Sequence, residues 1–135
     1  MCSSDLGDAL GFHANFTYTR GDDLKNDVPI GRIPPVFSEV SMRYSAMYGK
    51  VYIEPYMNIV GRQDQYAPGV SGDPRFTPGD APGYVLFGLR TGWTPNRNFR
   101  LSLNIQNIGN RSYHPMGSGT FGTGTNVAFT AELKW

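Results

Sequence analysis

Large apolar and polar residues alternate along six stretches of this chain. The most regular is FRLSLNIQ, from Phe99 to Gln106, in which every second side chain is Phe, Leu or Ile and those between are polar or charged. Similar alternation occupies residues 12–20, 38–48, 51–61, 84–93 and 126–135. A period of two places apolar side chains on one face of a β-strand and polar side chains on the other. The sequence therefore predicts an all-β fold with six half-exposed antiparallel strands.

The connections between these stretches alternate between short and long. Residues 48–50 (YGK) and 94–98 (TPNRN) have the composition of tight turns. Residues 21–35, 62–83 and 111–125 are long, polar and rich in glycine and proline. A compact soluble domain seldom has three such loops, whereas outer-membrane barrels combine short periplasmic turns with long extracellular loops. The pattern favours an up-and-down transmembrane β-barrel, or the part of one that six strands can form.

Charged residues of both signs fall on the polar face of the predicted strands. They are Glu39, Arg43, Glu54, Arg90, Arg100 and Glu132. Such charges are costly against lipid and suit a wet or plugged lumen, so we expect the opposite, apolar rows to face lipid. A soluble β-sandwich or small barrel would explain the alternation equally well, but not three long loops on one side.

Two local features refine this prediction. Pro55 stands on the apolar face of its strand, where it cannot donate to a ladder, and it suggests a bulge or local irregularity. Aromatic residues lie near both ends of the strands, as expected at the two membrane interfaces. They are Tyr48, Trp93, Phe99 and Trp135 near the short turns, and Tyr18 and Tyr84 near the long loops.

Composition narrows the class of protein further. The chain has 135 residues and a formal net charge of +1, which gives no reason to expect nucleic acid as a partner. No apolar run reaches the roughly 18 residues of a membrane-spanning helix, although a spanning strand needs only every second residue to be apolar. The single cysteine, Cys2, cannot form an internal disulfide. Residues 1–7 lack the regions of a secretory signal, and we expect a non-native or disordered leader or an ordinary flexible terminus there.

Residues 8–135 resemble the C-terminal barrel strands of TonB-dependent outer-membrane receptors. The resemblance is carried by five segments in order: residues 18–37, 60–68, 82–93, 101–115 and 126–135. One departure lies in the turn from Asn107 to Asn110, which reads Asn-Ile-Gly-Asn where the family often has Asn-Leu-Phe-Asp or similar. This difference removes a bulky residue from the turn and leaves the fold assignment unchanged.

The resemblance implies a fold and a function. Family members import scarce ligands, usually ferric siderophores, through a 22-stranded barrel that is occluded by an N-terminal plug and energised by TonB. The chain would then be the last six strands, without the plug and earlier strands, in the outer membrane of a Gram-negative bacterium. Its implied partners are outer-membrane lipid, the barrel-assembly machinery, TonB through the N-terminal region, and a small metal chelate. The alternative is a small closed outer-membrane barrel with a structural or adhesive role.

Candidate ligand contacts are few and lie in the predicted outer loops. They are Arg62, Asp64 and Tyr66 in one loop and His114 and Met116 in another. A histidine two residues from a methionine suits a copper or haem ligand, although ordinary loop composition explains the pair as well. No resident metal or cofactor is expected.

The last stretch carries a second predicted signal. Trp135 is preceded at alternate positions by Leu133, Ala131 and Phe129, which looks like the pattern by which outer-membrane proteins are recognised for barrel assembly. It would offer an edge strand with one apolar face for pairing during insertion.

Catalytic motifs do not support an enzyme. The two histidines, His13 and His114, lie far apart in the sequence, and no nucleophile elbow, zinc spacing or phosphate loop is present. A barrel hydrolase would have to use His13, the only histidine on a predicted strand. We therefore expect no enzymatic activity.

Overall fold

The computed structural model describes residues 9–24, 28–29, 33–62, 82–115, 118 and 120–135. Its strands are β1 (Ala9–Thr17), β2 (Asp22–Asp23), β3 (Val28–Pro29), β4 (Phe37–Ala46), β5 (Val51–Val60), β6 (Tyr84–Asn96), β7 (Phe99–Gln106) and β8 (Asn126–Leu133). The proposed leader at residues 1–7 lies outside the described residues. The all-β prediction is confirmed, and the described residues contain no helix.

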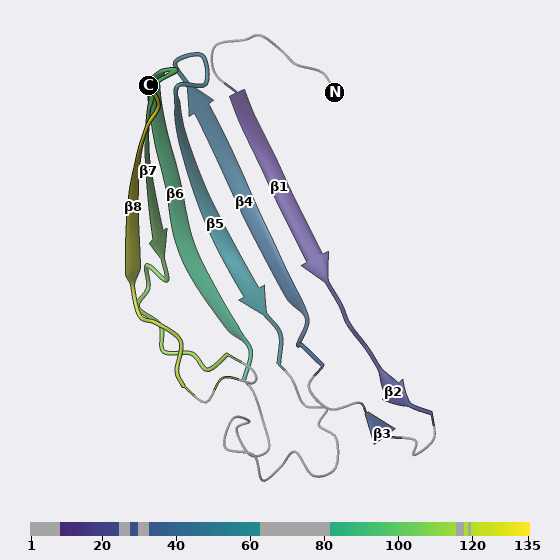
Figure 1. The fold of residues 1–135 in the computed structure, drawn as a ribbon. Helices are drawn as coiled ribbons and strands as arrows, with labels where there is room; N and C mark the ends of the chain where they lie inside the picture. The colour runs from purple at the N-terminus through teal and green to yellow at the C-terminus, as the bar shows by residue number, and fades with distance from the viewer. Residues whose placement is uncertain (1–8, 25–27, 30–32, 63–81, 116–117, 119) are drawn as a thin grey trace.

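Six strands form one antiparallel sheet in the order β1-β4-β5-β6-β7-β8 (Figure 1). Every pair of neighbours in this sheet is antiparallel, so the chain runs up and down as predicted. Each predicted stretch overlaps one of the six strands, with shifted ends. The first strand begins at Ala9 and ends at Thr17, and β6 continues through Thr94 to Asn96, residues that the sequence assigned to a turn.

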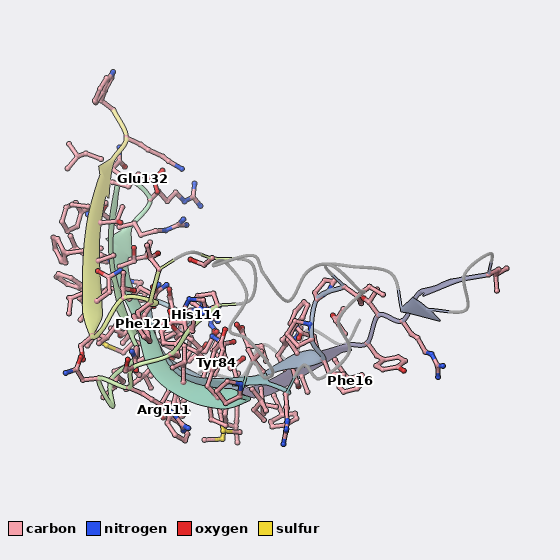
Figure 2. All side chains as sticks on the ribbon, turned by 90° about the horizontal axis from the view of Figure 1, so that it is seen from below. Phe16, Tyr84, Arg111, His114, Phe121 and Glu132 are labelled. Atoms are coloured by element: carbon pink, nitrogen blue, oxygen red, sulfur yellow. The ribbon has the colours of Figure 1, made fainter. Side chains whose placement is uncertain are left out.

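The sheet is curved, and its two faces differ in composition. Seen along the strands it forms an arc, with Glu132 on the concave side and Phe16 on the convex side (Figure 2). The register brings apolar positions together across the sheet. Phe12 of β1 lies opposite Met42 of β4, and Val40 of β4 lies opposite Met57 of β5. The register also aligns Glu54 with Arg90 and Arg90 with Asn104 on the polar face. The predicted division of each strand into an apolar and a polar row is confirmed.

The large apolar side chains of this sheet are not covered by another layer. Tyr56, at 6% exposure, is the only buried hydrophobic residue among those described. By contrast Phe12 (73%), Phe16 (70%), Phe129 (66%) and Leu133 (65%) are largely exposed. A sheet with this face open to water would leave a large apolar patch, so the convex face needs a further apolar partner. No helix among the described residues is long and apolar enough to cross a membrane.

Tyrosines lie flat over glycines on the concave face. A Cβ atom added to Gly88 would fall 2.1 Å from Cζ of Tyr56, and one added to Gly92 would fall 2.3 Å from Cε1 of Tyr52. Both glycines sit directly opposite their tyrosines in the β5–β6 register. A glycine in a strand has no side chain to pack, and a ring from the neighbouring strand fills the space that it leaves.

The local irregularity expected at Pro55 is present as an interruption of the ladder and not as a bulge. The β4–β5 ladder omits the two pairs around Pro55, but the pairs on either side keep one register, so no residue is inserted. A missing N–H interrupts a ladder without requiring a bulge. The register shift lies instead between β6 and β7, at Trp93 to Asn96, next to Pro95. There a proline is tolerated because the ladder is already broken.

The first long connection contains structure that the sequence analysis missed. Asp22–Asp23 pairs antiparallel with Val28–Pro29, and this two-stranded ribbon projects beyond the end of β1 (Figure 1). The two strands have two residues each, so they are too short to show alternation.

Left-handed backbone conformations and hydrogen bonds shape the short-turn end of the sheet. Met47, Tyr48 and Gly49 all have positive φ (54°, 58° and 79°) in the turn between β4 and β5. At the next turn the side chain of Asn98 donates to the carbonyl of Lys134 at 2.8 Å, and Lys134 N–H donates to the carbonyl of Asn98 at 2.8 Å. These bonds tie the residues after β8 to the β6–β7 turn, and Trp93 and Phe99 meet edge to face nearby, with centroids 6.4 Å apart.

Candidate functional site on the concave face

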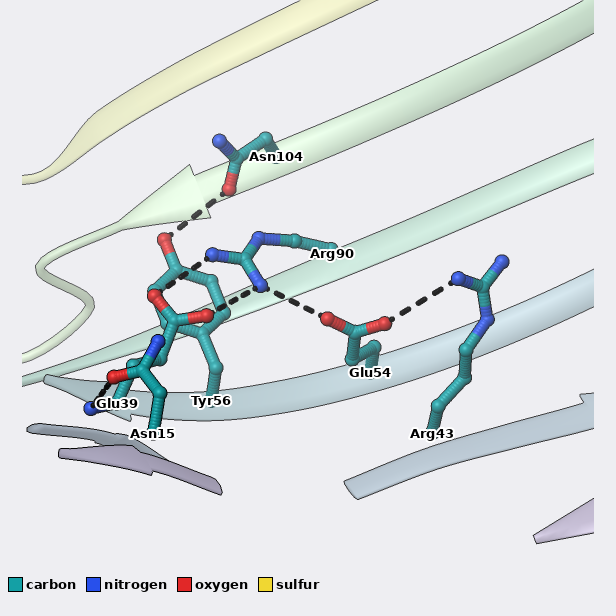
Figure 3. A network of polar contacts seen from close by, with 7 residues as sticks. All are labelled: Asn15, Glu39, Arg43, Glu54, Tyr56, Arg90 and Asn104. Atoms are coloured by element: carbon teal, nitrogen blue, oxygen red, sulfur yellow. Dashed lines mark hydrogen bonds and ion pairs between the residues drawn. The ribbon is translucent and has the colours of Figure 1, made fainter. Parts of the chain in front are cut away.

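Arg90 is the centre of an ion-pair network on the concave face (Figure 3). Its Nη1 and Nη2 bind the two carboxylate oxygens of Glu39 at 3.0 and 3.1 Å. The same Nη1 also binds Glu54 Oε1 at 2.9 Å. Two carboxylates from β4 and β5 thus hold one guanidinium from β6, and the bond to Glu39 is bidentate, the strongest geometry for this pair of groups.

The network continues to both sides of Arg90. Arg43 lies 3.6 Å from Glu54 through Nη1 and Oε2, and its guanidinium lies 3.7 Å above the Tyr52 ring. On the other side Asn15 of β1 accepts a hydrogen bond from the Glu39 backbone N–H at 3.0 Å. Two cations and two anions balance, so this part of the concave face is polar without a net charge.

Tyr56 connects the network to β7. Its ring lies over Gly88 of β6, and its hydroxyl donates to Asn104 Oδ1 of β7 at 3.2 Å. The guanidinium of Arg90 stacks on the Tyr56 ring with 4.0 Å between Cζ and the ring centroid. The side chain of Arg90 remains 34% exposed, so the Tyr56 ring and the two carboxylates leave part of it accessible.

A buried asparagine folds the β7–β8 loop back on itself. Asn107 is 3% exposed and has a positive φ of 49°. Its Oδ1 accepts from Arg111 N–H at 2.9 Å, and its Nδ2 donates to the carbonyls of Arg111 at 2.8 Å and Thr123 at 3.1 Å. The hydroxyl of Thr125 donates to the Asn107 carbonyl at 3.0 Å. Asparagine suits this place because it tolerates the left-handed region and offers both a donor and an acceptor.

Aromatic rings gather where this loop meets the sheet. Tyr84 and Tyr113 lie with centroids 4.7 Å apart, and His114 meets Phe121 edge to face at 5.5 Å (Figure 2). Tyr113 also lies over Gly122, where an added Cβ would fall 2.1 Å from the ring. Tyr84 lies at the loop end of β6 with its ring tilted by 41° against that of Tyr113, and its place in an interfacial belt stays a prediction.

A hollow of about 280 Å³ lies beside these rings and the Arg90 network. Its lining comes from β4 to β7 and from the loop: Glu39, Tyr56, Asn58, Leu86, Phe87, Arg90, Gln106, Asn107, Tyr113 and Thr123. A second hollow of about 400 Å³ lies towards β1 and shares Glu39 and Arg90 with the first. Arg90 therefore separates two hollows on the same face.

The predicted loop contacts are only partly within the described residues. Arg62 is exposed just after β5, and His114 is half-buried against Phe121. Asp64, Tyr66 and Met116 lie outside the described residues, so a pairing of His114 with Met116 stays a prediction. No group of three or more potential metal ligands occurs among the residues that the structure describes.

The predicted assembly signal lies on and just after the edge strand β8. Phe129 and Leu133 are exposed in β8, and Trp135 follows it fully exposed. Ala131 lies between them, opposite Leu101 of β7. Their role as a recognition signal stays a prediction.

His13, the candidate base of a barrel hydrolase, lies opposite Ser41 on the concave face. It lines the larger hollow with Glu39 and Glu54, whose carboxylates are engaged by Arg90. Both acids are thus committed to the ion-pair network rather than to orienting an imidazole.

Several residues of the site were not singled out from the sequence. Tyr56 and Asn107 are the clearest cases, since both are buried and both organise their surroundings. For Tyr56 the signal was Gly88, which lies opposite it in β6. This pairing can be recognised only when the register between β5 and β6 is known. The signal for Asn107 was an asparagine at the end of a strand in an Asn-x-Gly-Asn turn.

Comparison with known proteins places this geometry in a family. Residues 3–108 match the family model described as TonB dependent receptor-like, beta-barrel. Among solved structures, the copper transporter OprC shares 18% identity over 93% of this chain and 21% of its own, with a TM-score of 0.81. The ferric-catecholate import receptor Fiu from E. coli K12 shares 18% identity over 93% of this chain and 19% of its own, with a TM-score of 0.64.

No curated protein sequence matches the chain significantly. The chain spans about a fifth of the length of the two solved structures, and at 18% identity they establish the fold of the sheet. The family model covers well over half of the chain. The main strands of the chain run up and down in one curved sheet. This chain belongs to the family of TonB-dependent receptor β-barrels.

Proposed function

We propose that this chain forms part of the wall of an outer-membrane transporter that takes up a scarce ligand, such as a ferric siderophore or another metal chelate. The observation that carries the proposal is the contrast between the two faces of the curved sheet. The convex face exposes Phe12, Phe16 and Phe129, which suits contact with lipid hydrocarbon. The concave face carries the balanced Arg90 network, which suits a wet or plugged lumen.

The two ends of the sheet indicate how the strands run in the membrane. Short turns join β4 to β5 and β6 to β7, while the described ends of the long connections, after β1, β5 and β7, lie at the opposite end of the sheet (Figure 1). In outer-membrane barrels the long loops face outward, so the hollow beside Tyr113 would open towards the cell exterior. The energy source would be TonB, acting through the N-terminal region and plug of a full-length receptor.

Membership of the family and the cargo of the two similar transporters support a metal-containing ligand. OprC is described as a copper transporter and Fiu as a ferric-catecholate import receptor. The chain would reach the membrane with the help of the barrel-assembly machinery, to which residues 129–135 would be presented. Enzymatic activity is not part of this proposal.

Uptake by whole cells tests the proposal. The gene that encodes this chain is expressed in full in a Gram-negative host that lacks its own ferric-siderophore receptors. Accumulation of radioactive iron from ferric chelates, and of copper from copper(II) chloride, is measured with TonB present and absent. TonB-dependent accumulation of either metal supports the proposal. Outer-membrane insertion of the protein without any TonB-dependent uptake would contradict it.

The alternative, a small closed barrel with a structural or adhesive role, makes a different prediction. It would require β1 and β8 to meet, whereas the described strands form an open sheet with these two at its edges. A closed barrel made of this chain alone would migrate differently on SDS gels before and after heating. The transporter proposal expects that shift only for the full-length protein.

A further inference from the structure

We infer that the 280 Å³ hollow between the sheet and the β7–β8 loop is a contact site for a flat, aromatic group of the transported chelate. The inference rests on the proposed function and names the chemistry of the ligand. The exposed part of the Arg90 guanidinium, which lines the hollow, would provide the surface on which the aromatic group stacks.

The charge of Arg90 is already compensated. Its terminal nitrogens are engaged by Glu39 at 3.0 and 3.1 Å and by Glu54 at 2.9 Å. The two carboxylates use three of its five N–H donors, which reduces its capacity to bind an anion edge-on. Its side chain is still 34% exposed, and the guanidinium already stacks on a π-system at Tyr56, at 4.0 Å.

The remaining walls suit an aromatic group with polar substituents. Leu86 contributes an apolar surface and Tyr113 an aromatic ring. Asn58 contributes an amide that makes no side-chain hydrogen bond with any described residue, and Thr123 lies on the loop side. A hollow smaller than a usual ligand pocket accommodates one ring-sized part of a ligand rather than a whole chelate.

The hollow is also held in shape before any ligand arrives. Asn107 lines it and fixes the loop through its bonds to Arg111 and Thr123. Tyr113 is held by its contacts with Tyr84 and Gly122. A preorganised site loses less conformational freedom on binding, so even a few contacts contribute to affinity.

The test fills the hollow without touching the ion-pair network. Leu86→Trp places a large ring in the hollow, and Thr130→Trp places the same ring on the concave face near the short-turn end, outside its lining. Both variants are made in the full-length receptor, in cells without TonB so that binding is measured apart from transport. The probes are the iron(III) complex of dihydroxybenzoate, which is aromatic, and iron(III) desferrioxamine, a hydroxamate without an aromatic ring.

The expected result is that wild type binds the aromatic chelate in preference to the hydroxamate. Leu86→Trp should weaken that binding by about tenfold or more, while Thr130→Trp should leave it within about twofold. If Leu86→Trp fails to reach the outer membrane on an immunoblot, Asn58→Ala replaces it, and a loss of more than about threefold is expected.

Failure of this inference and failure of the proposed function give different results. A receptor that transports a metal with TonB but binds the aromatic chelate equally well with the hollow filled overturns the inference alone. So does a receptor that prefers the hydroxamate or free copper. A receptor that shows no TonB-dependent uptake at all overturns both.

Discussion

Replacing Asn107 by alanine should release the β7–β8 loop from the sheet. The side chain of Asn107 makes three hydrogen bonds, to both backbone groups of Arg111 and to the carbonyl of Thr123. At about 1 kcal/mol of net stabilisation for each, their loss costs about 3 kcal/mol. Alanine at a φ of 49° adds up to about 1 kcal/mol, because it lacks the polar side chain that lets asparagine tolerate the left-handed region.

The expected effect on loop opening follows from this sum. Since each 1.4 kcal/mol is a factor of ten, a loss of about 3–4 kcal/mol should make the open form of the loop about 100-fold to 1000-fold more populated. The hydrogen bonds that the Asn107 carbonyl accepts from the Asn110 N–H and the Thr125 hydroxyl persist in the variant, so they do not enter this difference. Asn107→Gly relieves the backbone but not the lost bonds, so it should fall between alanine and wild type.

Limited trypsin digestion measures the opening directly. The carbonyl of Arg111, which belongs to the peptide bond that trypsin cleaves, is the acceptor of the Asn107 amide at 2.8 Å. The rate of cleavage after Arg111 is followed by mass spectrometry in the full-length protein in detergent, with cleavage after Arg97 in the short turn as an internal reference. When reclosing is faster than cleavage, this rate reports the population of the open form.

A matched control distinguishes the loss of a buried asparagine from the loss of an exposed one. Asn126 is exposed at the start of β8, and its side chain meets Gln106 only at 3.5 Å. Asn126→Ala should change cleavage after Arg111 by less than about threefold. If Asn107→Ala also stays within threefold of wild type, the loop is not held by this side chain and the reasoning is refuted.

Three further predictions concern the sheet, each measured on the full-length protein. Gly88→Ala should lower the free energy of unfolding in urea by about 1–3 kcal/mol, because the new Cβ meets the tyrosine ring opposite, whereas Gly109→Ala, with no atom within 4 Å, should cost much less. Arg90→Met should cost about 2–4 kcal/mol, since it leaves the partly buried Glu39 without its ion-pair partner and Glu54 with Arg43 alone. By contrast Arg100→Met, at an exposed pair 3.7 Å apart, should cost about 0–1 kcal/mol, and equal losses for the two arginines would contradict this ranking. Trp135→Ala should lower the amount of protein in the outer membrane without changing total synthesis, and unchanged insertion would remove the proposed assembly signal.

The strands and their faces could be predicted from the sequence because one rule governs both. A period of two places Phe99 and Arg100 on opposite faces of the sheet, whichever strands are their neighbours. The structure follows this rule on all six strands of the main sheet. The ends were less predictable. Thr94 to Asn96 have turn composition, but the ladder to β7 continues past them through a register shift.

The partners of the site residues could not be obtained in the same way. The sequence placed Glu39, Glu54 and Arg90 in one polar row, but their contacts depend on register and on the reach of long side chains across β5. Asn107 was interpreted as an ordinary turn residue. Its burial results from the path of a loop that returns from Arg111 to Thr123, and no local pattern encodes that return.

Each strand of the wall hydrogen-bonds only to the strand next to it along the sheet, and in the main sheet the pairing follows chain order throughout. The wall is therefore specified by neighbouring hairpins and does not depend on the length of the connections at the loop end. Doubling such a connection costs only about 0.6 kcal/mol of closure entropy. We therefore expect the connections at the loop end to tolerate changes in length and sequence while the sheet that carries them keeps its shape.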